Sequence, residues 1–402
     1  MLDTLTHTYP GVYVEELPST LRSITGVRTS VTAFIGRALK GPVKYPQRIY
    51  SFEHYKRIFG GLWKPSNMSY AIYQYFQNGG KEALILRVAQ NENGTPDDDG
   101  EPFDDMKIDD ALSAFNRADI FSLLCIPPFN PKTNTTPTSI YDKALAYLEN
   151  EKKRVILIID PPRDWKRSHD PIGKMGVNSS EFLKLHNRNA VVYFPRLLAN
   201  DPLENNNQRE FVPCGAVAGI FARTDSVLGV WKSPAGIEAT LRGVPDLTVR
   251  LSDKENGELN ARGINCLRVL PRTGVVVWGA RTMHRLGGPV YQWKYIGVRR
   301  LALFIEESLY RGTQWIVFEP NDERLWSQIR LNLGQFMNDM YKSGAFQGKT
   351  PKDAYFVKCD NETTTQTDIC NGIINIVVGF APLKPAEFVV VRIQQMMNGQ
   401  RD

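Results

Sequence analysis

The stretch of this 402-residue chain that comes nearest to a ligand-binding motif is SGAFQGKT, from Ser343 to Thr350. A phosphate-binding loop requires glycine, four residues and then Gly-Lys-Ser/Thr, so that backbone N–H groups can surround the phosphates. Serine stands here in place of the first glycine, and the stretch follows a predicted long helix, whereas such a loop follows a strand. Gly344 is better explained as the residue that ends this helix. We therefore expect neither a nucleotide site nor any other cofactor.

The acidic and histidine side chains also offer little chemistry. Glu306 and Glu307 are adjacent in a predicted helix, and Arg311 follows Glu307 by four residues, the spacing of an ordinary helix ion pair. His169 and Asp170 lie in the charged loop RDWKRSHDP, which we interpret as solvated surface. The five histidines are far apart, without an HExxH, GxSxG or Cys/His signature. The sequence thus predicts no catalytic residue.

Metal-binding patterns are equally weak. The acidic loop NENGTPDDDGEPFDD, residues 91–105, superficially resembles a calcium loop, but placing Gly100 at the central glycine puts Thr95 where the first carboxylate should be. The cysteines are scattered and odd in number, and no two have CxxC spacing, so we interpret them as reduced core thiols. They are Cys125, Cys214, Cys266, Cys359 and Cys370. We expect no metal site and no disulfide.

The elements that would have to position a site alternate regularly between about residues 106 and 225. Short apolar strands in IFSLLCIPP, RVILIIDPP and NAVVYFPR are separated by predicted helices, a pattern typical of βαβ units and a parallel sheet. Strand ends such as Asp160 would lie where α/β enzymes place catalytic groups. Such an enzyme is the alternative function. Prolines occupy most of these positions instead: Pro127, Pro128, Pro161, Pro162 and Pro195.

The flanking regions mix helices and strands. On the N-terminal side, SITGVRTSVTAFIGRALKGP predicts two short strands, SFEHYKRIFGG a helix capped by glycine, and SYAIYQYFQNGGKEALILRV a helix followed by a strand. On the C-terminal side we expect a helix in VRRLALFIEESLYRG, a strand in WIVFEPN, a long helix over 322–342, and strands in AYFVKCD and IINIVVGFAP.

These patterns predict a mixed α/β fold, with a central parallel-sheet βαβ domain, a C-terminal α+β domain and extended strand arms at both ends. The expected segments are an N-terminal arm (1–25), a small β-rich region with an acidic surface loop (26–105), the α/β domain (106–274), the C-terminal domain (275–384) and a C-terminal arm (385–402).

Composition excludes several function classes. No apolar run reaches the 18 residues that a transmembrane helix needs, and the first residues, MLDTLTHTYP, lack the basic start and apolar core of a signal peptide. We therefore expect synthesis to end in the cytosol. The net charge of +6 is spread over both halves, whereas nucleic-acid-binding proteins usually concentrate theirs. A basic nucleic-acid-binding protein is thus a weaker alternative.

Both ends of the chain contain a short strand bounded by proline, TYPGVYVEELPS at the start and PAEFVVVRIQQMM at the end. Neither has an obvious neighbouring strand to pair with. An unpaired strand edge either finds a ladder in its own fold or completes a sheet in another chain. At about 3.3 Å per residue, the first 17 residues can span about 55 Å, far enough to reach another protomer.

Several blocks in order along nearly the whole chain resemble tail sheath proteins of contractile phage tails, R-type pyocins and extracellular contractile injection systems. The blocks are YPGVYVEE, VPCGAVAGIFARTDSVLGVWKSPAG, VWGARTM, YIGVRRLALFIEESL, FEPNDERLWSQIR, GAFQGKTPKDAYFVKCD and APLKPAEFVVVRI. The resemblance implies a structural protomer with no catalytic activity. It would polymerise helically around an inner tube by strand exchange, then contract and drive the tube through a target membrane.

The resemblance also implies partners and sites. Partners would be further copies of the chain, an inner tube protein, baseplate and terminal cap proteins and sheath paralogues, with no nucleic acid and no direct membrane insertion. The chain would be made in a bacterial cytoplasm and end in a virion tail or an extracellular particle. The strands exchanged would contain Val12, Tyr13, Val14, Glu15, Phe388, Val389, Val390, Val391 and Ile393. Arg324 and Lys342, on the polar face of the helix over 322–342, would contact the tube together with Arg330 and Lys349; an ordinary solvated helix surface is the alternative.

Overall fold

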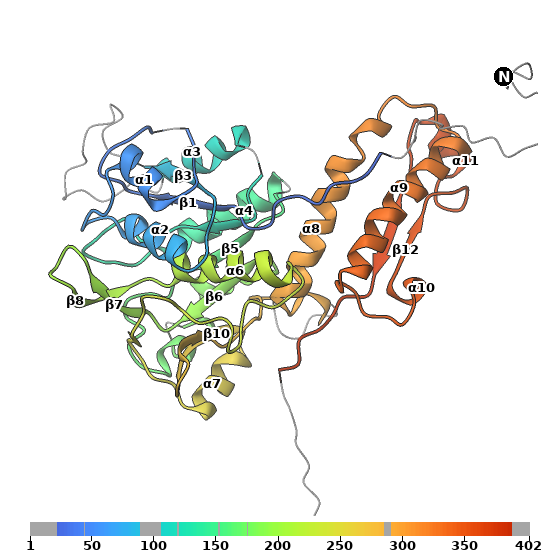
Figure 1. Ribbon diagram of the computed structural model, residues 1–402. Coiled ribbons are helices and arrows are strands. Elements are labelled where there is room, and N and C mark those ends of the chain that lie inside the picture. The colour runs from blue at the N-terminus through green and yellow to red at the C-terminus, as the bar shows by residue number, and fades with distance from the viewer. Residues whose placement is uncertain are drawn as a thin grey trace, which may run out of the picture. The chain divides into compact units, whose positions relative to one another are not determined.

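The computed structural model describes residues 22–43, 45–88, 106–118, 120–151, 153–174, 176–284 and 291–387. These residues form two compact units (Figure 1). The large unit contains the described residues between 26 and 308, with 345–347 and 382–387. The small unit contains residues 22–25, 309–344 and 348–381. Each unit is described by itself below.

The large unit is built around an eight-stranded sheet with the order β11-β10-β6-β5-β4-β1-β3-β2. The inner strands all run parallel, while β2 and β11 pair antiparallel at the two edges. The strands are β1 (Thr32–Gly36), β2 (Gln47–Ile49), β3 (Ala83–Arg87), β4 (Leu123–Cys125), β5 (Ile156–Ile159), β6 (Ala190–Phe194), β10 (Ile264–Leu270) and β11 (Gly274–Val277).

Helices cover both faces of this sheet. They are α1 (Phe52–Phe59), α2 (Asn67–Gln77), α3 (Met106–Ala114), α4 (Thr138–Asn150), α5 (Ser180–Leu183), α6 (Cys214–Leu228), α7 (Asp253–Asn260) and α8 (Ile296–Gly312), whose last residues belong to the small unit. The core on one face contains residues of α1, α2 and α6, and the core on the other contains residues of α3, α4, α5 and α7. Continuous apolar strands are expected where both faces are covered.

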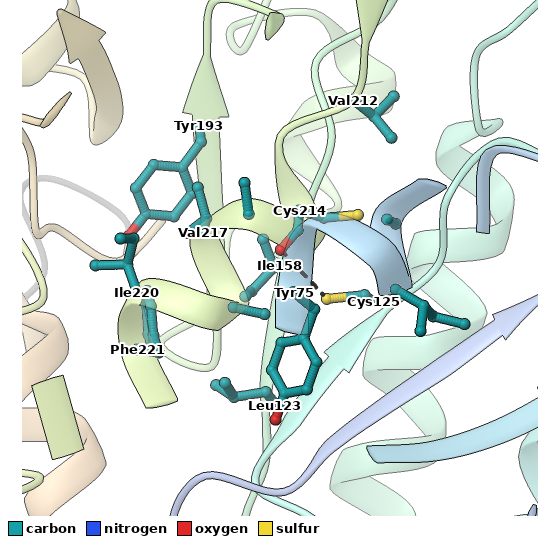
Figure 2. Packing of buried hydrophobic residues seen from close by; sticks show 14 of the residues in the cluster. Tyr75, Leu123, Cys125, Ile158, Tyr193, Val212, Cys214, Val217, Ile220 and Phe221 are labelled. Atoms are coloured by element: carbon teal, nitrogen blue, oxygen red, sulfur yellow. Dashed lines mark hydrogen bonds between the residues drawn. The ribbon is translucent and has the colours of Figure 1, made fainter. Parts of the chain in front are cut away.

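Alternate residues of each inner strand serve the two cores. In β5, Ile156 and Ile158 face one core, whereas Leu157 and Ile159 face the other. Figure 2 shows the first core, in which α6 contributes the side chains of Val217, Ile220 and Phe221 next to Ile158 and Tyr193. Every side chain labelled in this view is buried, so α6 packs directly against this face of the sheet.

A second, three-stranded sheet of the large unit has the order β8-β7-β9, with β7 (Leu197–Asp201), β8 (Asn207–Phe211) and β9 (Asp246–Leu247). The small unit consists of α9 (Glu323–Lys342), α10 (Pro351–Ala354), α11 (Gln366–Cys370) and an antiparallel ribbon of β12 (Tyr355–Lys358) and β13 (Val377–Phe380). Short 3-10 turns lie at Phe115–Arg117, Asp170–Ile172, Tyr291–Trp293 and Gln314–Ile316.

The mixed α/β fold is confirmed, as is the parallel sheet. The helix predicted over 322–342 is α9: the Asp322 carboxylate accepts the N–H of Leu325 at its start, and Gly344 follows its end with a φ of 81°. The domain boundaries stay a prediction. The main sheet runs across the boundary expected at residue 105, because β1, β2 and β3 belong to it.

Three expected elements differ in the structure. Instead of a strand in WIVFEPN, the chain forms the 3-10 turn Gln314–Ile316, because Trp315 and Ile316 turn into the core of the small unit. Instead of two strands before Gly36, the described part has only β1, since the N–H of Val27 donates to the Ser308 hydroxyl of α8 at 3.1 Å. The helix expected between the strands of RVILIIDPP and NAVVYFPR is only the single turn α5.

Candidate functional site

The carboxyl edge of the parallel sheet is where an enzyme of this fold would place its site, and Asp160 lies there directly after β5. Its Oδ1 accepts the N–H of Cys214, the first residue of α6, at 2.9 Å. Burial raises the pKa of Asp160 to about 6, although the hydrogen bonds from Cys214 and the charge of Arg196 oppose this. The carboxylate therefore caps a helix inside the protein.

The remaining polar groups at this edge hold loops together. Arg196 follows β6 and is 3% exposed; its guanidinium donates to the carbonyls of Pro161, at 2.8 and 3.0 Å, and of Asn134, at 2.6 Å. Its Nη1 lies 3.1 Å from Glu210. The prolines that follow the strands are buried here, Pro162 only partly: Pro127, Pro128, Pro161, Pro162 and Pro195. The edge is thus closed by proline rings and a satisfied arginine.

The other sequence candidates for chemistry have structural roles. Asp170 accepts the N–H groups of Lys166 and Arg167, both at 2.8 Å, and these bonds outweigh its burial and lower its pKa. The adjacent His169 side chain is 63% exposed. Glu307 lies 2.6 Å from Arg154, a partner that helix spacing does not predict. These groups hold a surface loop and a helix in place.

Metal ligation finds no support in the part of the chain described here. Within it, no group of three or more His, Cys, Asp or Glu side chains could hold a metal ion. The loop 91–105 lies outside the described residues. Four of the cysteines are buried free thiols as expected, but Cys370, at the end of α11, is exposed and is not a core residue. Likewise, no helix in the described ranges is long and apolar enough to cross a bilayer.

The residues expected to contact a tube all lie in the small unit. Arg324 and Lys342 are exposed on α9, and Lys349 is exposed in the turn after it. Arg330 is less available, because its guanidinium donates to Glu323 at 2.6 Å and also to the carbonyl of Cys359. The opposite, apolar face of α9 is buried: Leu325, Ile329, Leu333, Phe336, Met337 and Met340.

Sequence reasoning missed two contacts of Arg22 within the small unit. Asn332 is 2% exposed, yet its Oδ1 accepts the N–H of Arg22 at 3.2 Å. The guanidinium of Arg22 lies 4.8 Å from the centre of the Trp315 ring. At Arg22, where the described part of the chain begins, the backbone is thus hydrogen-bonded to α9. No pattern in the sequence signals a contact across 310 residues. The arm residues named above, at 12–15 and at 388–393, lie outside the described residues.

Comparison with known proteins assigns the fold to a family. A model of the phage tail sheath protein central domain matches residues 103–283, and a model of the phage tail sheath C-terminal domain matches residues 291–396. This chain belongs to the contractile tail sheath protein family. Because the family consists of structural proteins, the sheath chain is not an enzyme, and the sheet edge around Asp160 is part of its framework.

The curated relatives are phage and prophage proteins that match over part of their length. The tail sheath protein of Enterobacteria phage T4 is 27% identical over 166 residues, which is 41% of this chain and 24% of the T4 protein. A putative prophage major tail sheath protein of Pseudomonas aeruginosa (strain UCBPP-PA14) is 24% identical over 194 residues, 47% of each chain. The sheath chain therefore aligns with less than half the length of these two relatives.

Solved structures match almost end to end. The PVC sheath of an extracellular contractile injection system, in the contracted state, has a TM-score of 0.76 and 25% identity, covering 97% of this chain and 98% of that one. The helical sheath of the anti-feeding prophage, also contracted, has a TM-score of 0.76 and 28% identity, covering 97% and 99%. A chain from the anti-feeding prophage baseplate has a TM-score of 0.71 and 27% identity, covering 97% and 100%.

Proposed function

We propose that this chain is the protomer of a contractile sheath that polymerises helically around an inner tube and contracts to drive the tube through a target membrane. Neighbouring protomers are linked by strands that the N-terminal and C-terminal arms donate. The observation that carries the proposal is the end-to-end likeness to two subunits of contracted helical sheaths, covering 97% of this chain in each case. A sheath that contracts must keep its subunits linked while they reorient.

The ribbon of the small unit supports strand exchange. Among the described residues, β12 and β13 pair only with each other, so a further strand can be added at an outer edge of the ribbon. A two-stranded ribbon is marginally stable by itself, and added strands would stabilise it. Its strands have four residues each, the length of the segments VYVE at 12–15 and FVVV at 388–391. Each added ladder bond contributes about 0.5–1.5 kcal/mol.

Partners and location follow from the same proposal. The protomer binds further copies of itself, an inner tube protein and, at the ends of the sheath, baseplate and terminal cap proteins or sheath paralogues. The likeness to a chain of a baseplate structure supports the baseplate contact. The chain is made in a bacterial cytoplasm and becomes part of a virion tail or an extracellular particle. The likeness to the PVC and anti-feeding prophage subunits extends over almost the whole of both chains, and it favours an extracellular particle over a virion tail.

Arm deletion tests the proposal. Removing residues 1–17 leaves every residue of the described structure in place, so we expect a folded monomer with an unchanged melting temperature. Without the donated strand, this variant should form no long sheaths in electron micrographs, whereas the intact chain should. A deletion of Gly100 to Asp104, in the acidic loop, is the control and should assemble normally. Full-length sheaths from the arm deletion would refute strand exchange by this arm.

A further inference from the structure

Glu387 is the last described residue before the C-terminal arm, and it is held by a cluster of polar side chains in the large unit. Its two carboxylate oxygens accept from Arg281: Nε lies 2.7 Å from Oε1, and Nη2 lies 2.6 Å from Oε2. Lys294 lies 3.6 Å away, and the Tyr295 hydroxyl donates to Glu387 at 3.3 Å. Paired, charge-assisted hydrogen bonds of this geometry are among the strongest polar contacts in proteins.

The arginine of this pair is fixed to the main sheet. The side chain of Asn265, in β10, binds both backbone polar groups of Arg281: Oδ1 accepts its N–H at 2.7 Å, and Nδ2 donates to its carbonyl at 2.8 Å. The Arg281 side chain is 9% exposed and also donates to the carbonyl of Asn260, at the end of α7, at 2.6 Å. Glu387 is therefore attached to a rigid, buried part of the large unit.

We propose that Arg281 and Glu387 form a clamp that fixes the point from which the C-terminal arm, residues 388–402, leaves the large unit. Through the clamp, a force that a neighbouring protomer exerts on the arm is transmitted to the main sheet. This inference rests on the proposed function, since a fixed root matters only if the arm links protomers. Burial disfavours the charged Glu387, yet the hydrogen bonds and charges of Arg281 outweigh burial and lower the pKa of Glu387, as a formed pair requires.

The clamp shortens the tether of the arm. The preceding backbone contact with the large unit is the β-bridge between Phe346 and Pro382, five residues before Glu387. Opening the clamp would free this segment, which spans up to about 17 Å at 3.3 Å per residue. The donated strand would then search a larger volume around the neighbour, so its effective concentration at the binding edge would fall. The clamp thus favours strand exchange without forming part of the exchanged strand.

Cleavage by a glutamyl endopeptidase measures the clamp in the unassembled protein. The enzyme cuts after glutamate, and a protease must seat the Glu387 side chain in its own pocket, so the pair must open first. In the variant Arg281→Gln we expect cutting between Glu387 and Phe388 to be roughly tenfold faster or more, because charge-assisted bonds no longer hold the side chain. Cutting after Glu362, whose side chain is 77% exposed, provides the internal reference.

Two controls separate clamp opening from misfolding. Lys294→Gln keeps the bidentate pair and should leave cleavage at Glu387 within about twofold of the intact protein. The melting temperature of Arg281→Gln is measured alongside, because Arg281 also holds Asn260. The variant Glu387→Gln leaves that contact intact, so it tests assembly where Arg281→Gln fails to fold. Equal cleavage of the intact chain and a folded Arg281→Gln would overturn the clamp.

An assembly assay then tests whether the clamp affects strand exchange by the C-terminal arm. We expect Glu387→Gln to give shorter sheaths that break more readily under shear, and the charge exchange Arg281→Glu with Glu387→Arg to restore part of their length. A chain ending at Glu387 shows separately whether the arm is needed at all. If that chain fails to assemble while Glu387→Gln sheaths match the intact ones, the clamp is wrong and the arm proposal stands. If the shortened chain assembles normally, exchange of the C-terminal arm itself is wrong.

Discussion

Arg300 of α8 and Asp225 of α6 form a bidentate ion pair inside the large unit. Both N–O distances are 2.6 Å, and the side chains are 2% and 3% exposed. The same guanidinium donates to the carbonyl of Thr29 at 2.9 Å. Three segments that are far apart in the sequence are therefore joined at one buried cation. Taking both charges out of water has a large free-energy cost, which only their mutual attraction and hydrogen bonds offset, so neither charge can lose its partner without destabilising the fold.

Removing one partner should therefore be costly. We expect Asp225→Ala to lower the free energy of unfolding by about 3–5 kcal/mol, because Arg300 is left buried without a counter-charge. Chemical denaturation measures the change. The control is Arg250→Ala, which breaks the pair with Asp246 at a side chain that is 72% exposed and should destabilise the protein far less. Similar losses in the two variants would mean that the buried pair contributes no more than a surface pair.

Helices α2 and α6 pack against each other (Figure 1). Their close approach depends on two glycines of α6. A Cβ atom at Gly215 would lie 2.0 Å from the backbone oxygen of Ala71, and one at Gly219 would lie 2.6 Å from that of Tyr75. Backbone atoms cannot give way as a flexible side chain can. We expect Gly219→Ala to lower the free energy of unfolding by about 1–3 kcal/mol or more, measured by denaturation.

At a second helical glycine, Gly257, we expect substitution by alanine to change the free energy of unfolding in the opposite direction. At Gly257, inside α7, an added Cβ atom would meet no other heavy atom within 4 Å. Since alanine loses less backbone entropy on folding and favours the helix, Gly257→Ala should stabilise by about 0.5–1 kcal/mol. If both substitutions stabilise, α2 and α6 are not in close contact through their backbones.

Local patterns in the sequence predicted most of the helices and strands, but they did not indicate which distant residues form ion pairs. Strands β4, β5 and β6 were recognisable because each is an uninterrupted apolar run with a proline within two residues of its end, and α9 because apolar side chains recur every three or four residues. The WIVFEPN segment was misjudged for the same reason. Its four consecutive apolar residues suit a strand, but Phe318 has a φ of 71° and its side chain lies fully exposed. The run of apolar residues signals neither of these features.

Contacts that join distant residues gave no signal in one sequence. The pairs Arg300–Asp225 and Arg281–Glu387 are 75 and 106 residues apart, and any of many arginines could have been the partner. The expected tube-contact residues were named from one helical face and a family resemblance. The helical face itself is correct, because its pattern is local, but the ties of Arg330 to Glu323 and Cys359 depend on the fold around α9.

The buried carboxylate of Asp160 should make stability depend on pH. Its pKa in the folded protein is about 6, above the ordinary value of 3.8, so the folded state binds the proton more tightly than the unfolded state. The resulting stabilisation is present below about pH 4 and is lost as pH rises through about 6. Two pKa units correspond to about 3 kcal/mol at most.

Comparison with Asp160→Asn isolates this effect from all other carboxylates. Asparagine keeps an acceptor for the N–H of Cys214 but cannot ionise, so any constant cost of the substitution is the same at each pH. The free energy of unfolding of the intact protein minus that of the variant should therefore fall between about pH 4.5 and 7. A difference that does not change over this range would show that Asp160 titrates normally.

The exposed cations of α9 lead us to expect that the small unit holds the tube by charge. Arg324 and Lys342 extend from the polar face of a helix whose other face is buried, so changing them should not disturb the fold. Surface charge pairs are individually weak and are screened by salt, which suits a contact that must hold before contraction and release during it. We expect Arg324→Glu with Lys342→Glu to give sheaths that polymerise in the contracted form without co-purifying tube.

The charge-matched control reverses Lys166 and Lys254, two exposed lysines of the large unit, and should leave tube binding unchanged. Raising the salt concentration should weaken tube retention in the intact protein and in this control alike. Extended, tube-filled particles from the α9 variant would place the contact on another surface, and loss of tube in both variants would point to net charge instead of this helix.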